Sequence, residues 1–181
     1  MPNIKGESSV GLALIIKDDS EALMLRRGLD SIKNYVDKIY LTGTQEPQEE
    51  IKKIANEYGA IWSFYKWDKN FSNARNFSFS QVKEDYVLWM DCDDVWQNAE
   101  QIRSLVRDAY LYNQSAVFMD YLYMVDLDEH GNIREIVIEH KRERIIKNDG
   151  TFKWVGKLHE TLIEQHSENV VKVYRPEVKV V

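Results

Sequence analysis

Residues 86–94 read YVLWMDCDD, an apolar run that passes without a spacer into three acidic residues. The apolar part, 86–90, has the pattern of a strand that is covered on both faces of a sheet. Ligands of open α/β sheets bind at the carboxyl ends of the strands. We therefore expect Asp91, Asp93 and Asp94 to lie at the ligand-binding edge of a sheet.

Strand-like and helix-like segments alternate along the sequence around this stretch. The expected strands are 10–16, 38–42, 60–65 and 86–90, and the expected helices are 21–32, 47–58, 72–81 and 99–112. Ser20 and Ser72 are expected to cap the first and third helices, and Pro47 to stand in the first turn of the second. This order predicts an α/β fold with a mostly parallel sheet and helices on its faces.

The pattern changes after Ser115, where strand-like segments replace helices. Segments 116–125 and 133–140 flank a turn at 130–132, which indicates a hairpin. Further strand-like pieces are 152–154, 158–163 and 170–181. We expect one domain over residues 1–181, with a ligand-binding half at 8–114 and a β-rich half at 115–181.

Composition excludes several classes of protein. The 181 residues include 24 Lys and Arg against 30 Asp and Glu, and this acidic balance argues against broad nucleic-acid binding, which needs a basic surface. Cys92 is the single cysteine, so no disulfide can form within the chain, and we expect a reducing, cytoplasmic location. The apolar run at 10–16 is too short for a membrane-spanning helix, which needs ~20 residues, and lacks the flanks of a signal peptide.

The crowded acids predict a particular chemistry. Carboxylates that are close together repel one another, and a divalent cation relieves that repulsion because hard cations prefer oxygen ligands. Mg²⁺ or Mn²⁺ bound to one or two carboxylates keeps open positions for phosphate oxygens. The stretch after 86–90 therefore indicates a site for a metal and a diphosphate, with a solvated acidic turn as the alternative.

Asp91-Cys92-Asp93 matches the D-x-D motif of family-2 glycosyltransferases with the GT-A fold. Four other stretches agree with one bacterial branch of that family, namely LALIIKDDSEALMLRRGLDSI, IANEYGA, FSNARNFSF and WVGKLHE. D-x-D alone is common by chance, but the ordered set with its spacing is specific and covers residues 10–163. The chain resembles this family, which implies a Rossmann-like nucleotide-binding half followed by a β-rich half on the acceptor side.

The resemblance also implies a reaction. A sugar would move from a nucleoside-diphosphate sugar, with UDP as the expected nucleotide, to a saccharide, lipid-linked or protein acceptor. Mn²⁺ or Mg²⁺ would neutralise charge on the departing diphosphate. The acceptor, deprotonated by an enzyme carboxylate, would attack from the opposite face, so the reaction would invert the anomeric carbon.

Roles carried over from the family fall on named residues of this chain. Asp91, Asp93 and His159 would hold the metal. Glu160 would be the general base, and Asp94 would act near the sugar. The residues expected to contact the nucleotide-sugar are Lys17, Asp18, Asp19, Thr42, Gly43, Arg75, Asn76, Asp91 and Trp154.

The chain departs from the family pattern in two places. Leu41 stands where related sequences have an Asp associated with uracil recognition. Either Thr42 or Asp19 takes over that role, or the base is not uracil, or the donor binds weakly. The segment after the His-Glu pair is also short, which indicates a larger parent protein, or a partner or second copy that supplies the acceptor wall.

Alternatives stay open at the level of function and of single residues. One is a degenerate domain that binds a nucleotide-sugar or an acceptor without turnover. Another is an aspartyl phosphotransferase of the haloacid-dehalogenase type, although that class carries its D-x-D near the first strand. Arg75 is either a ligand contact or a salt bridge to the acidic stretch, Trp154 either stacks on a sugar or belongs to the core, and His159 is either a ligand or structural. Strand alternation turns Cys92 away from its acidic neighbours, so we expect no nucleophilic role for it.

Overall fold

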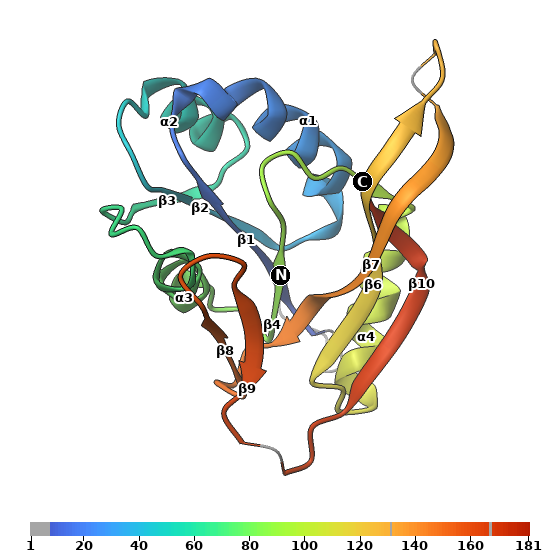
Figure 1. Cartoon of the computed structure of the whole chain (residues 1–181). Helices are drawn as coiled ribbons and strands as arrows, with labels where there is room; N and C mark the ends of the chain where they lie inside the picture. Colours follow the sequence, from blue (N-terminus) through green and yellow to red (C-terminus); the bar gives the residue numbers. More distant parts are fainter. Residues whose placement is uncertain (1–7, 131, 167) are drawn as a thin grey trace.

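The computed structural model describes residues 8–130, 132–166 and 168–181, and its first part is a set of parallel strands linked by helices (Figure 1). The parallel strands are β1 (Val10–Ile16), β2 (Lys38–Gly43), β3 (Ile61–Phe64) and β4 (Tyr86–Trp89). The helices are α1 (Ala22–Ile32), α2 (Glu49–Glu57), α3 (Phe71–Gln81) and α4 (Ile102–Leu111). Short 3₁₀ turns lie at Asp19–Glu21, Lys33–Tyr35 and Ala99–Gln101. The predicted alternation of strands and helices is confirmed.

The second part of the chain consists of strands. These are β6 (Ala116–Leu127), β7 (Ile133–Lys147), β8 (Phe152–Val155), β9 (Thr161–Glu164) and β10 (Lys172–Val180). A short strand, β5 (Trp96–Gln97), lies earlier, between β4 and α4. β6 and β7 pair antiparallel, as the predicted hairpin requires, and β8 and β9 form a separate two-stranded sheet.

One eight-stranded sheet unites both parts, in the order β3-β2-β1-β4-β7-β6-β10-β5. β7 pairs antiparallel with β4, so the hairpin continues the parallel sheet beyond its fourth strand. β10 pairs parallel with β6. The carboxyl ends of β1, β2 and β4 therefore meet at one edge of the sheet, where α/β folds bind ligands.

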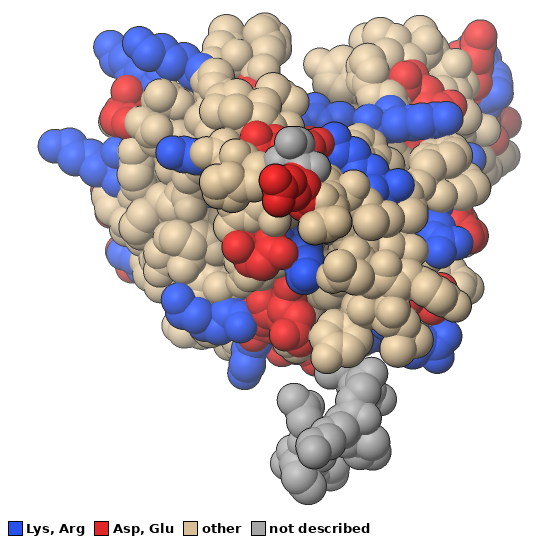
Figure 2. Space-filling view, turned by 90° about the horizontal axis from the view of Figure 1, so that it is seen from below, with Lys and Arg blue, Asp and Glu red and all other residues tan. Residues whose placement is uncertain are grey.

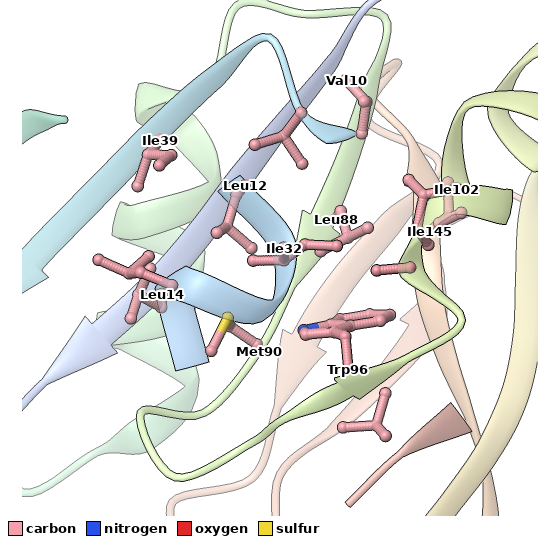
Figure 3. Packing of buried hydrophobic residues seen from close by; sticks show 14 of the residues in the cluster. Val10, Leu12, Leu14, Ile32, Ile39, Leu88, Met90, Trp96, Ile102 and Ile145 are labelled. Carbon is pink, nitrogen blue, oxygen red and sulfur yellow. The ribbon is translucent and has the colours of Figure 1, made fainter. Parts of the chain in front are cut away.

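The larger core lies on the face of the sheet that α1, α2 and α4 cover. Alternation along the strands sends Leu12 and Leu14 of β1, together with Leu88 of β4 and Met90 directly after it, into this core (Figure 3). Helical spacing places an apolar stripe of α1 against them. The buried residues of that stripe are Leu25, Leu29 and Ile32.

The opposite face of the sheet is covered by α3 and by the β8–β9 pair, which lie next to each other in Figure 1. Ala13 of β1 is small, so α3 packs close to the sheet there. Further along, Trp89 of β4 meets Trp154 of β8 edge to face, with ring centroids 5.0 Å apart. The alternation that buries Trp89 on this face also turns Asp91, two residues later, toward α3.

The helix caps differ from the sequence prediction. Asp18, not Ser20, caps the 3₁₀ turn that leads into α1, because its carboxylate accepts the Ser20 N–H at 2.9 Å. Asn70, not Ser72, caps α3. In both cases the side-chain oxygen of an Asp or Asn two residues before the serine accepts a free N–H at the start of the helical segment. Pro47 lies before α2 rather than in its first turn, since the helix begins at Glu49.

Two strand boundaries also differ. The expected strand at 158–163 begins only at Thr161, because Gly156 and His159 have positive φ angles of 101° and 55° and form a turn. β7 continues to Lys147, well beyond the expected end at 140. Gly131 of the predicted hairpin turn lies outside the described residues.

The surface charge agrees with the acidic composition. Figure 2 shows the face that lies at the bottom of Figure 1, where Asp and Glu side chains gather near the centre with Lys and Arg on both sides. Among the described residues that this view shows, Lys and Arg side chains form no broad basic patch of the kind that nucleic-acid binding requires. Within the described ranges, no helix is both long and apolar enough to span a membrane.

Leu12→Ala should lower the free energy of unfolding by about 2–5 kcal/mol, because it leaves a cavity in the larger core. Urea denaturation measures the loss. Leu23→Ala is the matched control, since Leu23 is 81% exposed on α1. Equal losses in the two variants would contradict the assignment of this core.

Candidate active site

A pocket of about 320 Å³ opens at the edge where the parallel strands end. Its walls come from the ends of β1 and β2, from the start of α1, from the segment before α3 and from the turn after β4. The residues that line it are Ile15, Ile16, Lys17, Glu21, Met24, Thr44, Gln45, Trp67, Phe71, Asp91, Cys92 and Asp93. This is a size and a position typical of small-molecule sites in α/β proteins.

The loop after β1 is fixed through its main chain. The Lys17 N–H donates to Glu21 Oε2 at 2.6 Å, and Gln48 Nε2 donates to the Lys17 carbonyl at 2.6 Å. The Gln45 N–H donates to the same carbonyl at 2.9 Å. The main chain is therefore held by hydrogen bonds, while the side chain of Lys17, which is about half exposed, lines the pocket with its ammonium 3.6 Å from Asp18 Oδ2.

The acidic turn, residues 91–94, is closed by hydrogen bonds between its ends. The Asp91 N–H donates to Asp94 Oδ2 at 2.8 Å, and the Asp94 N–H donates to the Asp91 carbonyl at 3.2 Å. Asp94 is buried, and its Oδ2 also accepts from Nη1 of the buried Arg144 at 2.6 Å. Asp94 thus supports the turn from inside the protein, while Asp91 and Asp93 face the pocket.

One face of α3 joins the first part of the chain to the segment that contains β8. The Ser72 hydroxyl donates to the Gly156 carbonyl. Asn76 exchanges two hydrogen bonds with the main chain of Trp154, donating from Nδ2 to its carbonyl at 2.9 Å and accepting its N–H at 3.0 Å. These contacts hold the segment up to Glu160 against α3.

Arg75 of α3 lies between two carboxylates that are far apart in the sequence. Its Nη2 donates to Asp91 Oδ1 at 2.7 Å, and its Nε donates to Glu160 Oε1 at 2.5 Å. Its guanidinium carbon lies 4.8 Å from the ring centroid of Trp89 and 5.0 Å from that of Trp154. A buried guanidinium with two carboxylates and two aromatic faces is satisfied both by charge and by packing.

The ion pairs set the protonation states at the site. Burial alone would lower the pKa of Arg75, but the charges of Asp91 and Glu160 outweigh it and raise that pKa. Burial would raise the pKa of Asp91, but the charge of Arg75 outweighs it and lowers that pKa. Burial raises the pKa of Asp94 in spite of the nearby Arg144. Asp91 therefore carries its negative charge at neutral pH.

Five of the residues predicted for the site lie at or beside the pocket. Lys17, Asp91 and Asp93 line it, and Arg75 links Asp91 to Glu160. Arg75 forms the salt bridge to Asp91 that the sequence left open as one of two roles, and it binds Glu160 as well. Cys92 packs against the larger core, and burial raises the pKa of its thiol, in agreement with the expectation that it is not a nucleophile.

Asp18 and Asp19, two predicted nucleotide contacts after β1, instead accept hydrogen bonds from main-chain N–H groups at the starts of helical segments. The carboxylate of Asp18 accepts the N–H of Ser20. Oδ1 of Asp19 accepts the N–H of Ile51 at 3.0 Å, in the first turn of α2. Free N–H groups at a helix start are strong donors, and a carboxylate that satisfies them stabilises the helix. Neither Asp18 nor Asp19 belongs to the pocket lining.

Two predicted contacts at the end of β2 are buried in the sheet. Thr42 has no exposed surface, and its hydroxyl shares a hydrogen bond of 2.9 Å with that of Ser63. A Cβ on Gly43 would lie 2.3 Å from the Trp62 ring, so this position is closely packed. The residues of this segment that line the pocket are the next two, Thr44 and Gln45.

Burial and position give four further predicted residues a setting other than the one expected. Trp154 is 1% exposed and belongs to the core, so it offers no surface on which a sugar could stack. Asn76 is engaged with the main chain of Trp154, and Asp94 lies beneath the acidic turn rather than beside a sugar. His159 is exposed in the turn before β9. Across the described residues, no group of three or more His, Cys, Asp and Glu side chains is placed to hold a metal, so the predicted set of Asp91, Asp93 and His159 is not assembled.

Several site residues were not predicted. Trp67 and Phe71 form an aromatic wall, with ring centroids 4.8 Å apart, just before and at the start of α3. Phe71 is the first residue of FSNARNFSF and Trp67 lies four residues before it, which was a usable signal because the end of β3 lies at the same sheet edge. Thr44 and Gln45 directly follow Thr42 and Gly43, the two residues of this stretch that were expected to contact the nucleotide-sugar. Arg144 gave no signal, since it stands among alternating charges in β7.

The residues at the pocket fit a divalent cation as a two-carboxylate site. Asp91 and Asp93 supply hard oxygen ligands at the pocket, and ions such as Mg²⁺ take one or two carboxylates and complete their shell with phosphate oxygens and water. Arg75 engages Oδ1 of Asp91 and keeps that carboxylate ionised. Asp91 and Asp93 would therefore complete the coordination shell of a cation only together with a phosphate-bearing ligand.

Asp91→Asn should remove a pH-dependent part of the stability. The folded pKa of Asp91 is lowered, so its contribution is present above the unfolded pKa of about 3.9 and is lost as pH falls through the folded pKa. The difference in unfolding free energy between wild type and variant should be largest above about pH 5 and shrink toward about pH 2. Urea denaturation over this range measures it, with Asp93→Asn as the control for charge loss from the same turn. A difference that does not change with pH would contradict the assignment.

Comparison with known proteins places this chain in a family. The sequence profile described as Glycosyl transferase family 2 matches residues 20–165, most of the chain. No curated protein matches the sequence. Among solved structures, S. aureus TarS is similar with a TM-score of 0.52 and 11% identity over 67% of this chain and 23% of TarS. The structure of TarS 1-349 gives a TM-score of 0.51 and 12% identity over 67% of this chain and 38% of that one.

At these identities the structural likeness concerns the fold, and the chain spans well under half the length of the TarS chains it matches. The family profile covers the acidic turn, Arg75 and Glu160. The chain belongs to glycosyl transferase family 2 and has the GT-A fold.

Proposed function

We propose that this glycosyltransferase moves a sugar from a UDP-sugar to a saccharide, lipid-linked or protein acceptor, with inversion and with a divalent cation that assists departure of the diphosphate. The observation that carries the proposal is the bridge formed by Arg75. It places a pocket-lining acid, Asp91, and a second acid, Glu160, on the two sides of one guanidinium. One carboxylate is thus available on the side of the leaving group and another for the acceptor.

The pocket offers complementary groups for a nucleoside diphosphate. The wall of Trp67 and Phe71 suits an aromatic base, and Gln45 provides an amide that can both donate and accept hydrogen bonds. Leu41 is fully buried, so its side chain does not contribute to recognition of the base. The ammonium of Lys17, whose side chain is about half exposed, complements a phosphate charge.

A cation bound to Asp91 and Asp93 would act as a Lewis acid toward the departing diphosphate. The protein's own contribution is to fix these carboxylates. Arg75 holds Asp91 in its ionised form, and the closed acidic turn presents Asp93 beside it. Fixed groups that meet developing charge need no reorganisation during the reaction.

Glu160 is the proposed general base. As the acceptor oxygen attacks the anomeric carbon, the bond from that carbon to the diphosphate oxygen breaks, and the acceptor proton passes to the carboxylate of Glu160. Arg75 binds Oε1 and leaves Oε2 to take the proton. The side chain is 11% exposed, so it is held in place and still open to an acceptor.

A domain that binds a nucleotide-sugar without turnover is the second candidate. The observation that favours it is the same ion pair, because the carboxylate of Glu160 is already bound by a buried guanidinium. Turnover of any donor, by transfer or by hydrolysis, excludes this candidate.

Mn²⁺ together with UDP should raise the melting temperature, since both bind only the folded protein. At a ligand concentration of about 100 Kd the rise should be about 5–10 °C. Asp91→Ala and Asp93→Ala should each abolish most of the shift in differential scanning fluorimetry. Asp126→Ala, on the distal part of β6, is the control and should keep it. A shift that survives both pocket substitutions would rule out the proposed metal site.

Glu160→Gln should reduce turnover by about 10²–10⁴-fold, because it removes the proton acceptor. Donor affinity should change little, since Glu160 does not line the pocket. Release of UDP in the presence of a donor panel measures turnover, and calorimetry measures UDP affinity. His159→Ala is the matched control from the adjacent exposed position. Full activity in Glu160→Gln would assign the base elsewhere.

A further inference from the structure

Arg144 is a fully buried arginine beneath the acidic turn. It lies on β7, and its guanidinium carbon is 4.1 Å from the ring centroid of Trp89 and 4.5 Å from that of Tyr121. Nη1 donates to Asp94 Oδ2 at 2.6 Å and to the Trp89 carbonyl at 3.4 Å. Arg144 therefore contacts both the strand that precedes the turn and the acid that closes it.

The contacts continue from Arg144 to the pocket. Asp94 Oδ2, which accepts from Arg144, also accepts the N–H of Asp91 at 2.8 Å. One carboxylate oxygen thus joins a fixed guanidinium to the main chain of a pocket-lining residue. α1 is in close contact with the acidic turn as well. A Cβ on Gly28 of α1 would lie 2.8 Å from the Asp94 carbonyl oxygen.

The cost of burying two charges indicates that the Arg144–Asp94 pair fixes the geometry of the acidic turn and adds little to the free energy of unfolding. Moving two charges into the interior costs several kcal/mol per ion, and their attraction repays that cost only when the remaining donors are satisfied. Among the described residues, Nε and Nη2 of Arg144 have no hydrogen-bond partner. An ion pair that contributes little to net stability but has a single geometry fits a positioning role.

We propose that Arg144 is a positioning residue, which acts through Asp94 to hold the acidic turn in the shape that presents Asp91 and Asp93 to the cation and the diphosphate. The inference rests on the proposed function for the role of those two acids. It adds a residue from the β6–β7 hairpin to the machinery of the donor site. Arg144 itself touches neither donor nor metal, because Asp94 lies between it and Asp91.

Arg144→Lys is the informative substitution. It keeps the buried positive charge next to Asp94, but an ammonium lacks the planar fork that lets a guanidinium contact Asp94 and the Trp89 carbonyl in a fixed orientation. Arg142→Lys is the matched control. Arg142 also lies over the Trp89 ring, at 5.3 Å from the centroid, and its ion-pair partner is Glu143. Its charge also acts on Asp91, and lysine keeps that charge.

Two quantities should be measured on the full chain well below the melting temperature of every variant. The first is the Kd of Mn²⁺ in the presence of UDP, by calorimetry, and Arg144→Lys should weaken it by about 10-fold or more, as loss of groups that orient metal ligands does. The second is hydrogen exchange of the Asp91 amide by NMR, which should become about 10-fold faster as the bond to Asp94 loosens. Arg142→Lys should leave both unchanged.

The outcomes separate this inference from the proposed function. If wild type binds no Mn²⁺ but the Asp91 amide exchanges faster in Arg144→Lys, the metal function fails while the positioning role stands. If Arg144→Lys lowers only the melting temperature and changes neither the Kd nor the exchange rate, Arg144 is merely structural and the inference is overturned. If Arg144→Lys does not fold, Asp94→Asn gives the same readouts, because it keeps an oxygen for the Asp91 N–H and removes the charge that Arg144 pairs with.

Discussion

The guanidinium of Arg75 imposes the constraint on which the site depends. A buried cation needs opposite charges in contact, and removal of one partner leaves an uncompensated charge that costs about 3–5 kcal/mol. Its partners, Asp91 and Glu160, come from the turn after β4 and from the segment before β9. The chain must therefore fold so that both carboxylates reach one face of α3. The same contacts hold an ionised acid at the pocket and a second acid beside it.

Strand alternation and main-chain hydrogen bonds bring both carboxylates to this face of α3. Strand alternation sends Leu88 and Met90 into the larger core and turns Trp89 and Asp91 toward α3. Asn76, the residue after Arg75 on α3, fixes the main chain of Trp154. Arg144 also lies against the Trp89 ring and holds Asp94, so two buried arginines contact the same tryptophan, and each binds a different acid of the acidic turn.

Much of this arrangement was predictable from the sequence, and the exceptions have physical reasons. Continuous apolar runs and helical apolar stripes determine which segments form strands or helices and which face is buried. The parallel strands, the helices and the sheet edge that carries Asp91 and Asp93 were therefore predicted. The cap at Asp18 was missed because a neighbouring serine has the same capability. Thr42 and Trp154 were placed at the ligand because a motif gives proximity in sequence but not burial. Arg144 was missed because its partner, Asp94, is 50 residues away and its neighbours in β7 are charged.

The most direct test of this account is a crystal structure with Mn²⁺ and UDP, in which anomalous scattering locates the metal. We expect an anomalous peak bound by the carboxylates of Asp91 and Asp93 and by diphosphate oxygens, with Arg75 still in contact with Glu160. A peak bound elsewhere, or UDP in the pocket with no metal at the acidic turn, would contradict it.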